Sequence, residues 1–160
     1  MRVGNSYDLH NLTAGTGFYL GGVFITCQYQ VEAISDGDIL LHTISEAIIG
    51  ALGLGDLGVW FDETNQKIAS SVILEKSLAL MTAQNYQIGN IDGTIIVDQP
   101  RLQDNKKAIK VNLQKLLQID QTKINLKATT TEQNFPNIIQ SYTTLLLLPK
   151  VMKQKGRVRD

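Results

Sequence analysis

The sequence predicts an α/β fold, described more closely as an α+β sandwich in which helices pack on one face of a single mixed sheet. Segments with helical periodicity alternate with β-branched, apolar segments along the 160 residues, and this alternation is typical of a helix-covered sheet. The segment 138–148 is too apolar for an exposed strand, so we expect it inside the sheet. Because helices on one face leave the other face open, we expect subunits to associate through the sheet.

The chain length predicts a single domain. A chain of 160 residues usually forms one domain around one core, and its 43% hydrophobic content is ordinary for a globular protein. We therefore expect one domain over residues 1–150. Residues 151–160 form a basic C-terminal tail that we expect to be disordered.

Strands are expected from the N-terminus onward. If residues 2–10 form a strand, Asp8 and His10 point to the same face, because side chains alternate with period two. Residues 11–17 are expected to form a loop. Gly21-Gly22 lies between the apolar segments 18–20 and 23–25, which indicates a β-hairpin. Later strands are expected at 88–97, 124–130 and 138–148.

The clearest helix begins at Ser35. Ser35 and Asp38 fit a capping box, and Gly53 is expected to end the helix. Between them, apolar residues recur at helical spacing and predict a face toward the core: Leu40, Leu41, Ile44, Ile48 and Leu52. Two further helices are expected over 70–85 and 103–117.

The acidic loop 55–65 has two interpretations, a lid over a site or plain surface. Trp60 and Phe61 favour a loop that packs on something, because two aromatic side chains are rarely left free on a polar loop.

Charge and cysteine content exclude several function classes. Fifteen basic and fifteen acidic residues give no net charge, so we expect no nucleic-acid and no membrane partner. No signal peptide, plastid-type targeting segment or membrane span is recognisable, and we expect a cytoplasmic protein. Cys27 is the only cysteine, which excludes an internal disulfide and a zinc site built on several thiolates.

The two histidines both lie near carboxylates. Asp38, His42 and Glu46 are four residues apart in succession, so on a helix both carboxylates could support the imidazole. Asp8, His10 and His42 would supply two nitrogens and one oxygen, a set that suits Zn²⁺ with one position left for substrate or water. The alternative is that His42 is an ordinary helix histidine and His10 an exposed residue.

The segment 127–132, Lys-Ala-Thr-Thr-Thr-Glu, follows an expected strand. Hydroxyls and backbone amides bind phosphate oxygens, and a carboxylate among phosphates usually implies a bridging Mg²⁺. The alternative is a threonine-rich strand end followed by a turn.

Together these segments resemble the 2-C-methyl-D-erythritol 2,4-cyclodiphosphate synthase family over most of the chain. The motifs that carry the resemblance occur in the family's order and at its separations: Asp8-Leu9-His10, Ser35-Asp36-Gly37-Asp38 with His42 and Glu46-Ala47, Gly55-Asp56-Leu57-Gly58 with Phe61, Asn90-Ile91-Asp92 with Thr94-Ile95-Ile96 before Pro100, and 127–132.

The resemblance implies a homotrimer with active sites at subunit boundaries. Its substrate would be the cytidine diphosphate compound 4-diphosphocytidyl-2-C-methyl-D-erythritol 2-phosphate, whose 2-phosphate attacks the β-phosphorus and releases CMP. Asp8, His10 and His42 would hold Zn²⁺ or another divalent transition metal, and Glu132 would help to hold Mg²⁺ or Mn²⁺. Thr130 would stabilise the transition state, with Asp38 and Glu46 as supporting carboxylates. The residues that would contact substrate are Asp8, His10, Ser35, Asp56, Leu57, Gly58, Phe61, Glu63, Asn65, Pro100, Arg101, Leu102, Ala128, Thr129, Thr130, Thr131, Glu132 and Phe135.

The chain departs from the family pattern at several phosphate-contacting positions. The family usually has a histidine before the Ser-Asp-Gly-Asp motif, where this chain has Ile34. After Phe135 it lacks the family's glycine-rich segment and arginine, and residues 62–65 and 5–7 also differ. The loss of one preorganised donor typically lowers turnover by roughly 10²–10³-fold. Two alternatives follow: a paralogue that binds metal and cytidine nucleotide without efficient turnover, or an enzyme acting on another cytidine diphosphate compound.

Overall fold

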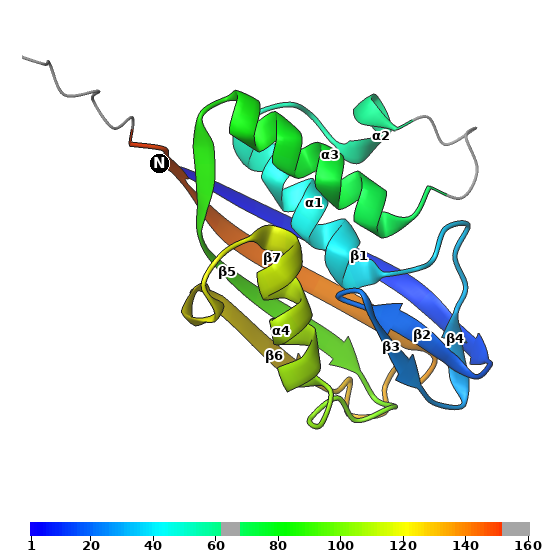
Figure 1. Ribbon diagram of the computed structural model, residues 1–160. Coiled ribbons are helices and arrows are strands. Elements are labelled where there is room, and N and C mark those ends of the chain that lie inside the picture. The colour runs from blue at the N-terminus through cyan, green and yellow to red at the C-terminus, as the bar shows by residue number, and fades with distance from the viewer. Residues whose placement is uncertain (62–67, 152–160) are drawn as a thin grey trace, which may run out of the picture.

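A five-stranded mixed sheet forms the centre of the protein, as seen in a computed structural model that describes residues 1–61 and 68–151 (Figure 1). The strand order is β4-β1-β7-β5-β6, and β2 and β3 form a separate two-stranded sheet. The elements are β1 (Arg2–Ala14), β2 (Gly17–Leu20), β3 (Val23–Thr26), β4 (Tyr29–Val31), α1 (Ile39–Leu52), α2 (Leu57–Trp60), α3 (Ser70–Ala83), β5 (Tyr86–Val97), α4 (Lys106–Leu117), the 3₁₀ helix η1 (Gln121–Lys123), β6 (Ile124–Thr129) and β7 (Ile138–Pro149).

β7 is the middle strand, as its apolar sequence predicts. It pairs antiparallel with β1 on one side and with β5 on the other, whereas β5 and β6 run parallel. Alternate side chains of β7, among them Ile139, Leu145 and Leu147, are fully buried beneath the helices. The predicted α/β class is therefore confirmed, with the hairpin as a second small sheet.

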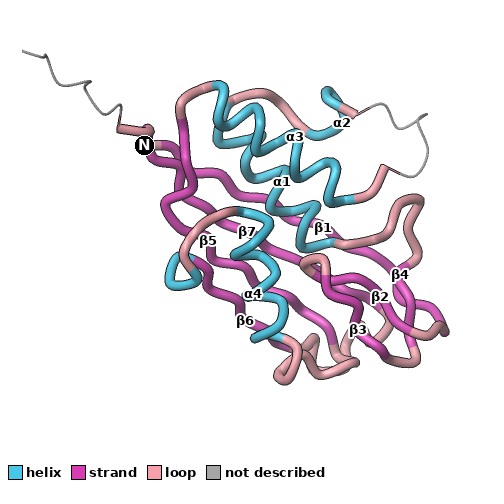
Figure 2. The backbone as a smooth tube through the Cα atoms, viewed as in Figure 1, coloured by secondary structure: helices cyan, strands magenta, loops and turns pink. Residues whose placement is uncertain are grey.

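The helices form one layer over one face of the sheet (Figure 2). Helix α1 packs on β1 and β7, α4 packs near β6, and α3 packs against α1. Gly4 permits the close approach of α1 to β1, because a Cβ there would overlap the carbonyl oxygen of Ala47. The opposite face of the sheet carries exposed apolar side chains, namely Val3, Tyr7, Leu9 and Tyr142.

Helix α1 begins later than its capping-box motif predicts. Asp38, not Ser35, is the N-cap, and the Asp38 carboxylate accepts a hydrogen bond from the Leu41 amide at 3.0 Å. The same carboxylate accepts hydrogen bonds from the amides of Gly21 and Gly22 in the β2–β3 turn. A carboxylate with three amide donors is a stronger cap than the Ser35 hydroxyl, so the helix starts after it. Gly53 ends the helix in a left-handed conformation, as predicted.

Other predicted boundaries shift by a few residues. The prediction of a loop over residues 11–17 is wrong in part, because β1 continues to Ala14 and residues Leu12 to Ala14 pair with β4. Burial of Leu12 against the core favours this extension. Helix α4 begins at Lys106 rather than 103, and α3 ends at Ala83 rather than 85. The predicted lid residues 62–65, and with them Glu63 and Asn65, lie outside the described residues, as does the tail 152–160.

None of the helices within residues 1–61 and 68–151 is long and apolar enough to cross a membrane.

Candidate functional site

Asp8 and His10 lie side by side on the helix-facing side of β1, as period-two alternation predicts. His10 Nε2 lies 3.3 Å from Asp8 Oδ2, and both side chains are about one quarter exposed, 25% and 24% respectively. The other carboxylate oxygen, Asp8 Oδ1, accepts a hydrogen bond from the Leu9 amide at 2.8 Å. Strand β1 therefore holds an imidazole and a carboxylate in a fixed pair.

His42 lies near this pair on helix α1, which packs against β1. Burial by itself would raise the pKa of the Asp8 carboxyl, but the interactions with His10, His42 and the Leu9 amide outweigh it and lower that pKa. Within residues 1–61 and 68–151, no three side chains of the histidine, cysteine or carboxylate type lie together as a ready metal site. The structure thus shows the Asp8–His10 pair with His42 nearby, and the zinc role of the three residues stays a prediction.

The side chains of Asp8, His10 and His42 nevertheless fit a divalent transition metal as ligands. Asp8 Oδ2 is buried and makes no hydrogen bond in the described part of the chain, although it lies at ion-pair distance from His10. A buried carboxylate oxygen without a hydrogen-bond partner is costly, and a cation would satisfy it. Two imidazoles and one carboxylate are ligands that zinc accepts in open, catalytic sites.

The carboxylates predicted to support His42 contact backbone amides instead. Asp38 is 1% exposed, and its carboxylate accepts hydrogen bonds from the amides of Gly21, Gly22 and Leu41. Burial raises its pKa, and these three hydrogen bonds offset only part of that effect. Glu46 Oε2 accepts a hydrogen bond from the Leu57 amide at 3.2 Å, so it supports the loop that contains Asp56. The two carboxylates therefore anchor the loops at either end of α1.

The Ser-Asp-Gly-Asp motif forms a folded link between β4 and α1. The Gly37 amide donates to Ser35 Oγ at 3.4 Å, which keeps the hydroxyl of Ser35 on the inside of the turn. Asp36 accepts hydrogen bonds from the amide and the hydroxyl of Ser70 and so joins the motif to the first turn of α3. Ile34, directly before the motif, is 76% exposed and therefore contributes little to the core.

Residues 56–61 pack on the protein, as their two aromatics predict. Asp56 is the N-cap of the short helix α2 and accepts a hydrogen bond from the Val59 amide. Trp60 and Phe61 pack against a small cluster of Ile49, Leu57 and Ile73. Lys76 lies over both aromatic rings, 4.7 Å from the centroid of Phe61.

The threonine-rich segment ends β6 and forms a tight turn. Ala128, Thr129, Thr130 and Glu132 are exposed, whereas Thr131 is partly buried. Thr130 Oγ1 lies 3.2 Å from Glu132 Oε1, to which it donates a hydrogen bond. In the segment that follows the neighbouring strand β5, Pro100 is partly buried, Arg101 is exposed and Leu102 is buried in the core. Phe135, at the far end of the turn, is 61% exposed.

Asp98 is a residue of this region that was not predicted from the sequence. Its two carboxylate oxygens accept hydrogen bonds from the amide and the hydroxyl of Thr131, at 2.6 and 2.7 Å. The sequence feature that could have identified Asp98 is its position directly after strand β5. The carboxyl ends of the parallel strands β5 and β6 meet at one edge of the sheet, so residues that follow these two strands lie close together.

The two groups of predicted site residues lie at the same end of the sheet but on different strands. Leu9 pairs with Gln140, Gln140 with Ile96, and Ile96 with Thr129, so these four residues form a row across the sheet. Three strand spacings separate the backbones of Leu9 and Thr129 by about 14 Å. One chain therefore does not place Thr130 and Glu132 beside the Asp8–His10 pair.

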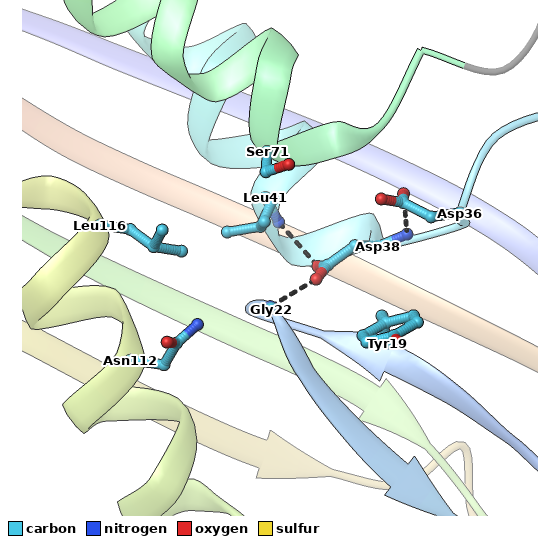
Figure 3. A pocket seen from close by; sticks show the side chains of 8 residues that line it. All are labelled: Tyr19, Gly22, Asp36, Asp38, Leu41, Ser71, Asn112 and Leu116. Atoms are coloured by element: carbon cyan, nitrogen blue, oxygen red, sulfur yellow. Dashed lines mark hydrogen bonds between the residues drawn. The ribbon is translucent and has the colours of Figure 1, made fainter.

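A pocket of about 460 Å³ lies elsewhere, between the β2–β3 hairpin and the helices (Figure 3). Tyr19, Asp36, Ser71 and Asn112 line it, together with apolar side chains. Two of its polar side chains already make hydrogen bonds within the protein: Asp36 accepts from the Ser70 amide, and Asn112 donates to the Gly21 carbonyl oxygen. None of the predicted zinc ligands lines this pocket.

Comparison with known proteins places this chain in a family. The sequence profile of the YgbB family matches residues 1–147. The 2-C-methyl-D-erythritol 2,4-cyclodiphosphate synthase of Fusobacterium nucleatum is 41% identical over 157 residues, which cover 94% of this chain and 98% of that protein. The chain belongs to the 2-C-methyl-D-erythritol 2,4-cyclodiphosphate synthase family. This confirms the resemblance noted in the sequence.

Other relatives of the cyclodiphosphate synthase family agree. The chloroplastic synthase of Arabidopsis thaliana is 40% identical over 156 residues, which cover 93% of this chain and 68% of that protein. A solved 2C-methyl-D-erythritol-2,4-cyclodiphosphate synthase superposes with a TM-score of 0.88 at 33% identity, covering 92% of this chain and all of that one. The IspF of Plasmodium falciparum, solved as a CDP complex, superposes with a TM-score of 0.83 at 33% identity, covering 94% of this chain and 97% of that one.

Proposed function

We propose that this protein is a cyclising, CMP-releasing lyase of isoprenoid precursor biosynthesis, a 2-C-methyl-D-erythritol 2,4-cyclodiphosphate synthase. The 2-phosphate of 4-diphosphocytidyl-2-C-methyl-D-erythritol 2-phosphate attacks the β-phosphorus, and CMP leaves. The observation that carries the proposal is the Asp8–His10 pair, whose buried Asp8 Oδ2 makes no hydrogen bond in the described part of the chain. The chain also matches the synthase of Fusobacterium nucleatum along 98% of that protein. CDP complexes among the similar structures support a cytidine nucleotide as the ligand.

Asp8, His10 and His42 are the residues that would hold Zn²⁺, and Glu132 would help to hold Mg²⁺ or Mn²⁺. When bound, the cations supply positive charge that polarises the phosphates and offsets charge on the leaving group. This explains how a chain with no net charge binds a polyanionic substrate.

The chain's own groups then position the substrate. Thr130 Oγ1, which donates to Glu132 in the present structure, is the hydroxyl that would turn to a phosphate oxygen in the complex. The Asp56–Gly58 turn, held by Glu46 through the Leu57 amide, and the Ser35 turn are proposed to bind the erythritol phosphate end. Because the nucleophile and the electrophile belong to one molecule, correct positioning supplies much of the rate.

We also propose a homotrimer whose active sites lie between subunits. Within one chain about 14 Å separate the backbones of Leu9 and Thr129, so Asp8 and His10 need the Thr130–Glu132 turn of a neighbouring subunit. The sheet face opposite the helices supports this assembly, because it exposes Val3, Tyr7 and Tyr142 by 66%, 47% and 50%.

The experiment that tests the function is incubation of the purified protein with the substrate, Zn²⁺ and Mg²⁺, followed by ³¹P NMR and chromatography. We expect equal amounts of CMP and the cyclic diphosphate. Asp8→Asn keeps the shape of the side chain but weakens the zinc site, so it serves as the matched negative control. CMP release no faster in the native protein than in Asp8→Asn would contradict the proposal.

The exposed Ile34 keeps a second candidate function open, a protein that binds metal and cytidine nucleotide without efficient turnover. Calorimetric titration with CDP, combined with the CMP-release assay above, separates the two functions. Binding together with CMP release supports the synthase, whereas binding without release supports the second candidate.

A further inference from the structure

The carboxylate of Asp98 joins two segments that the resemblance assigns to substrate contact, residues 100–102 and residues 128–132. Asp98 directly follows the last residue of β5 and lies two residues before Pro100, in the chain that leads to Leu102. Its side chain reaches across to the turn after β6, where it accepts hydrogen bonds from the amide and hydroxyl of Thr131. These contacts, at 2.6 and 2.7 Å, are short bonds to a charged acceptor, which is the strong class of hydrogen bond.

Thr131 in turn organises the rest of the turn. Thr131 Oγ1 accepts a hydrogen bond from the Phe135 amide at 3.0 Å. The Thr131 carbonyl oxygen accepts hydrogen bonds from the amide and side chain of Asn134, at 3.1 and 2.8 Å. Thr131 is therefore the point at which the turn 130–135 is attached to β5.

This turn has an unfavourable backbone that needs such an attachment. Glu132 and Gln133 have φ angles of 55° and 62°, in the left-handed region that residues other than glycine seldom adopt. A residue in this region is unfavourable on its own and persists only when its surroundings determine its conformation. Among the described residues, the exposed side chains of Thr130 and Glu132 hydrogen-bond only within the turn: Thr130 Oγ1 donates to Glu132 Oε1 and accepts from the Glu132 amide.

The direction of the hydrogen bonds requires a carboxylate at position 98. A carboxylate only accepts, so the Thr131 hydroxyl must donate its proton to Asp98. The oxygen of that hydroxyl is then free to accept from the Phe135 amide. An asparagine amide at position 98 would place a donor against the hydroxyl and leave the hydroxyl proton without its acceptor.

We propose that Asp98 is a positioning residue, which acts through Thr131 to hold Thr130 and Glu132 in place for the cytidine diphosphate substrate. This proposal rests on the proposed function for the identity of that ligand. Asp98 does not touch the reacting atoms in this scheme. Its carboxylate fixes the turn that carries the residues that do.

Asp98→Asn tests the proposal, with Asp92→Asn as the matched control. Asp92 lies within β5, and its carboxylate also accepts hydrogen bonds from the β6 segment, from Asn125 and Lys127 at 2.8 Å each, but it lies away from the turn. We expect Asp98→Asn to speed hydrogen exchange of the amides of Thr131 and Phe135 by about tenfold or more, and to weaken CDP binding by a similar factor. Asp92→Asn should change neither quantity.

The conservative variant Thr131→Ser adds a rescue test. Serine keeps the amide and the hydroxyl, so exchange and CDP affinity should stay near the native values, whereas Thr131→Val should behave like Asp98→Asn. The double variant Asp98→Asn/Thr131→Val should lose little more than either single variant, because the two residues share one interaction. The unfolding midpoints of all variants are measured in parallel.

The outcomes separate this proposal from the proposed function. Native exchange rates at Thr131 and Phe135 in Asp98→Asn would overturn the positioning role, whatever the enzyme's activity. Faster exchange confined to the turn, with weaker CDP binding, supports it even if the native protein releases no CMP, in which case only the reaction is wrong. Faster exchange without any change in CDP binding would also overturn it.

Discussion

The rings of Tyr7 and Tyr142 lie against each other with centroids 4.6 Å apart, on the sheet face opposite the helices. The two residues are direct cross-strand partners on β1 and β7, and each is about half exposed. Such an aromatic pair at the centre of an open sheet is typical of a buried contact in an assembly.

Tyr142→Lys is expected to convert the proposed trimer to monomers, because it places a charge in the contact. Light scattering coupled to size exclusion measures the mass. Phe24→Lys is the matched control, since Phe24 is exposed to a similar degree and pairs with Tyr19 on the β2–β3 hairpin. A native protein that is a monomer at micromolar concentration would contradict the assembly.

Elemental analysis is expected to find one zinc per native chain. His42→Ala removes one of two imidazoles, so the zinc content should fall severalfold after dialysis against a weak chelator. Cys27→Ala should keep its zinc, because the Cys27 thiol already donates to the Tyr29 carbonyl oxygen and lies outside the proposed ligand set. Equal zinc in native protein and His42→Ala would show that His42 is not a ligand.

Ile34→His is expected to raise turnover. The family usually carries a histidine at this position, and one preorganised donor to a reacting phosphate is worth roughly 10²–10³-fold in rate. Ile34 is 76% exposed, so the substitution should leave the unfolding midpoint unchanged. Ile34→Leu controls for side-chain volume. If kcat is the same in all three proteins, the position does not contact the reacting phosphate.

Thr43→Val is expected to destabilise the fold by about 1–3 kcal/mol, because it leaves two buried hydroxyls without their partner. Thr43 Oγ1 lies 2.8 Å from both Ser141 Oγ and Thr143 Oγ1, between α1 and β7. Urea unfolding measures the loss. The triple variant Thr43→Val/Ser141→Ala/Thr143→Val removes all three hydroxyls and should recover part of the stability lost in Thr43→Val. A triple variant no more stable than Thr43→Val would contradict this account.

Asp92 gives a pH dependence of stability with a defined sign. Its hydrogen bonds from Lys127 and Asn125 lower the pKa of the carboxyl in the folded state. The contribution is therefore present above the unfolded-state pKa and is lost as pH falls through the folded-state value. Because the pair is exposed, it contributes less than about 1 kcal/mol. Thermal unfolding of native protein and Asp92→Asn should differ at pH 7 and converge near pH 2.

Much of the fold was predictable because it depends on local patterns. The apolar run of β7, the Gly21-Gly22 turn and the stripe on α1 each identify their element without reference to the rest of the chain. The pairing of Asp8 with His10 was predictable for the same reason, since two residues on one strand always share a face.

The predicted element boundaries were wrong where a hydrogen-bond partner far away in the sequence decided the local structure. Asp38 rather than Ser35 caps α1, because Gly21 and Gly22 of the hairpin turn supply two further amides to the Asp38 carboxylate. β1 extends past His10 because Leu12 to Ala14 find partners on β4. Neither partner is adjacent in sequence, so no local pattern reveals it.

By itself, the sequence determined the fold class and the family, since these follow from residue types and their spacing, and it predicts the site residues on the same basis. The tertiary structure alone decided that Asp98 holds Thr131, that Asp38 and Glu46 bind backbone amides, and that three strand spacings separate Leu9 from Thr129. The physical reason is that hydrogen-bond partners and distances between strands depend on how separate segments pack, and packing is a property of the whole folded chain.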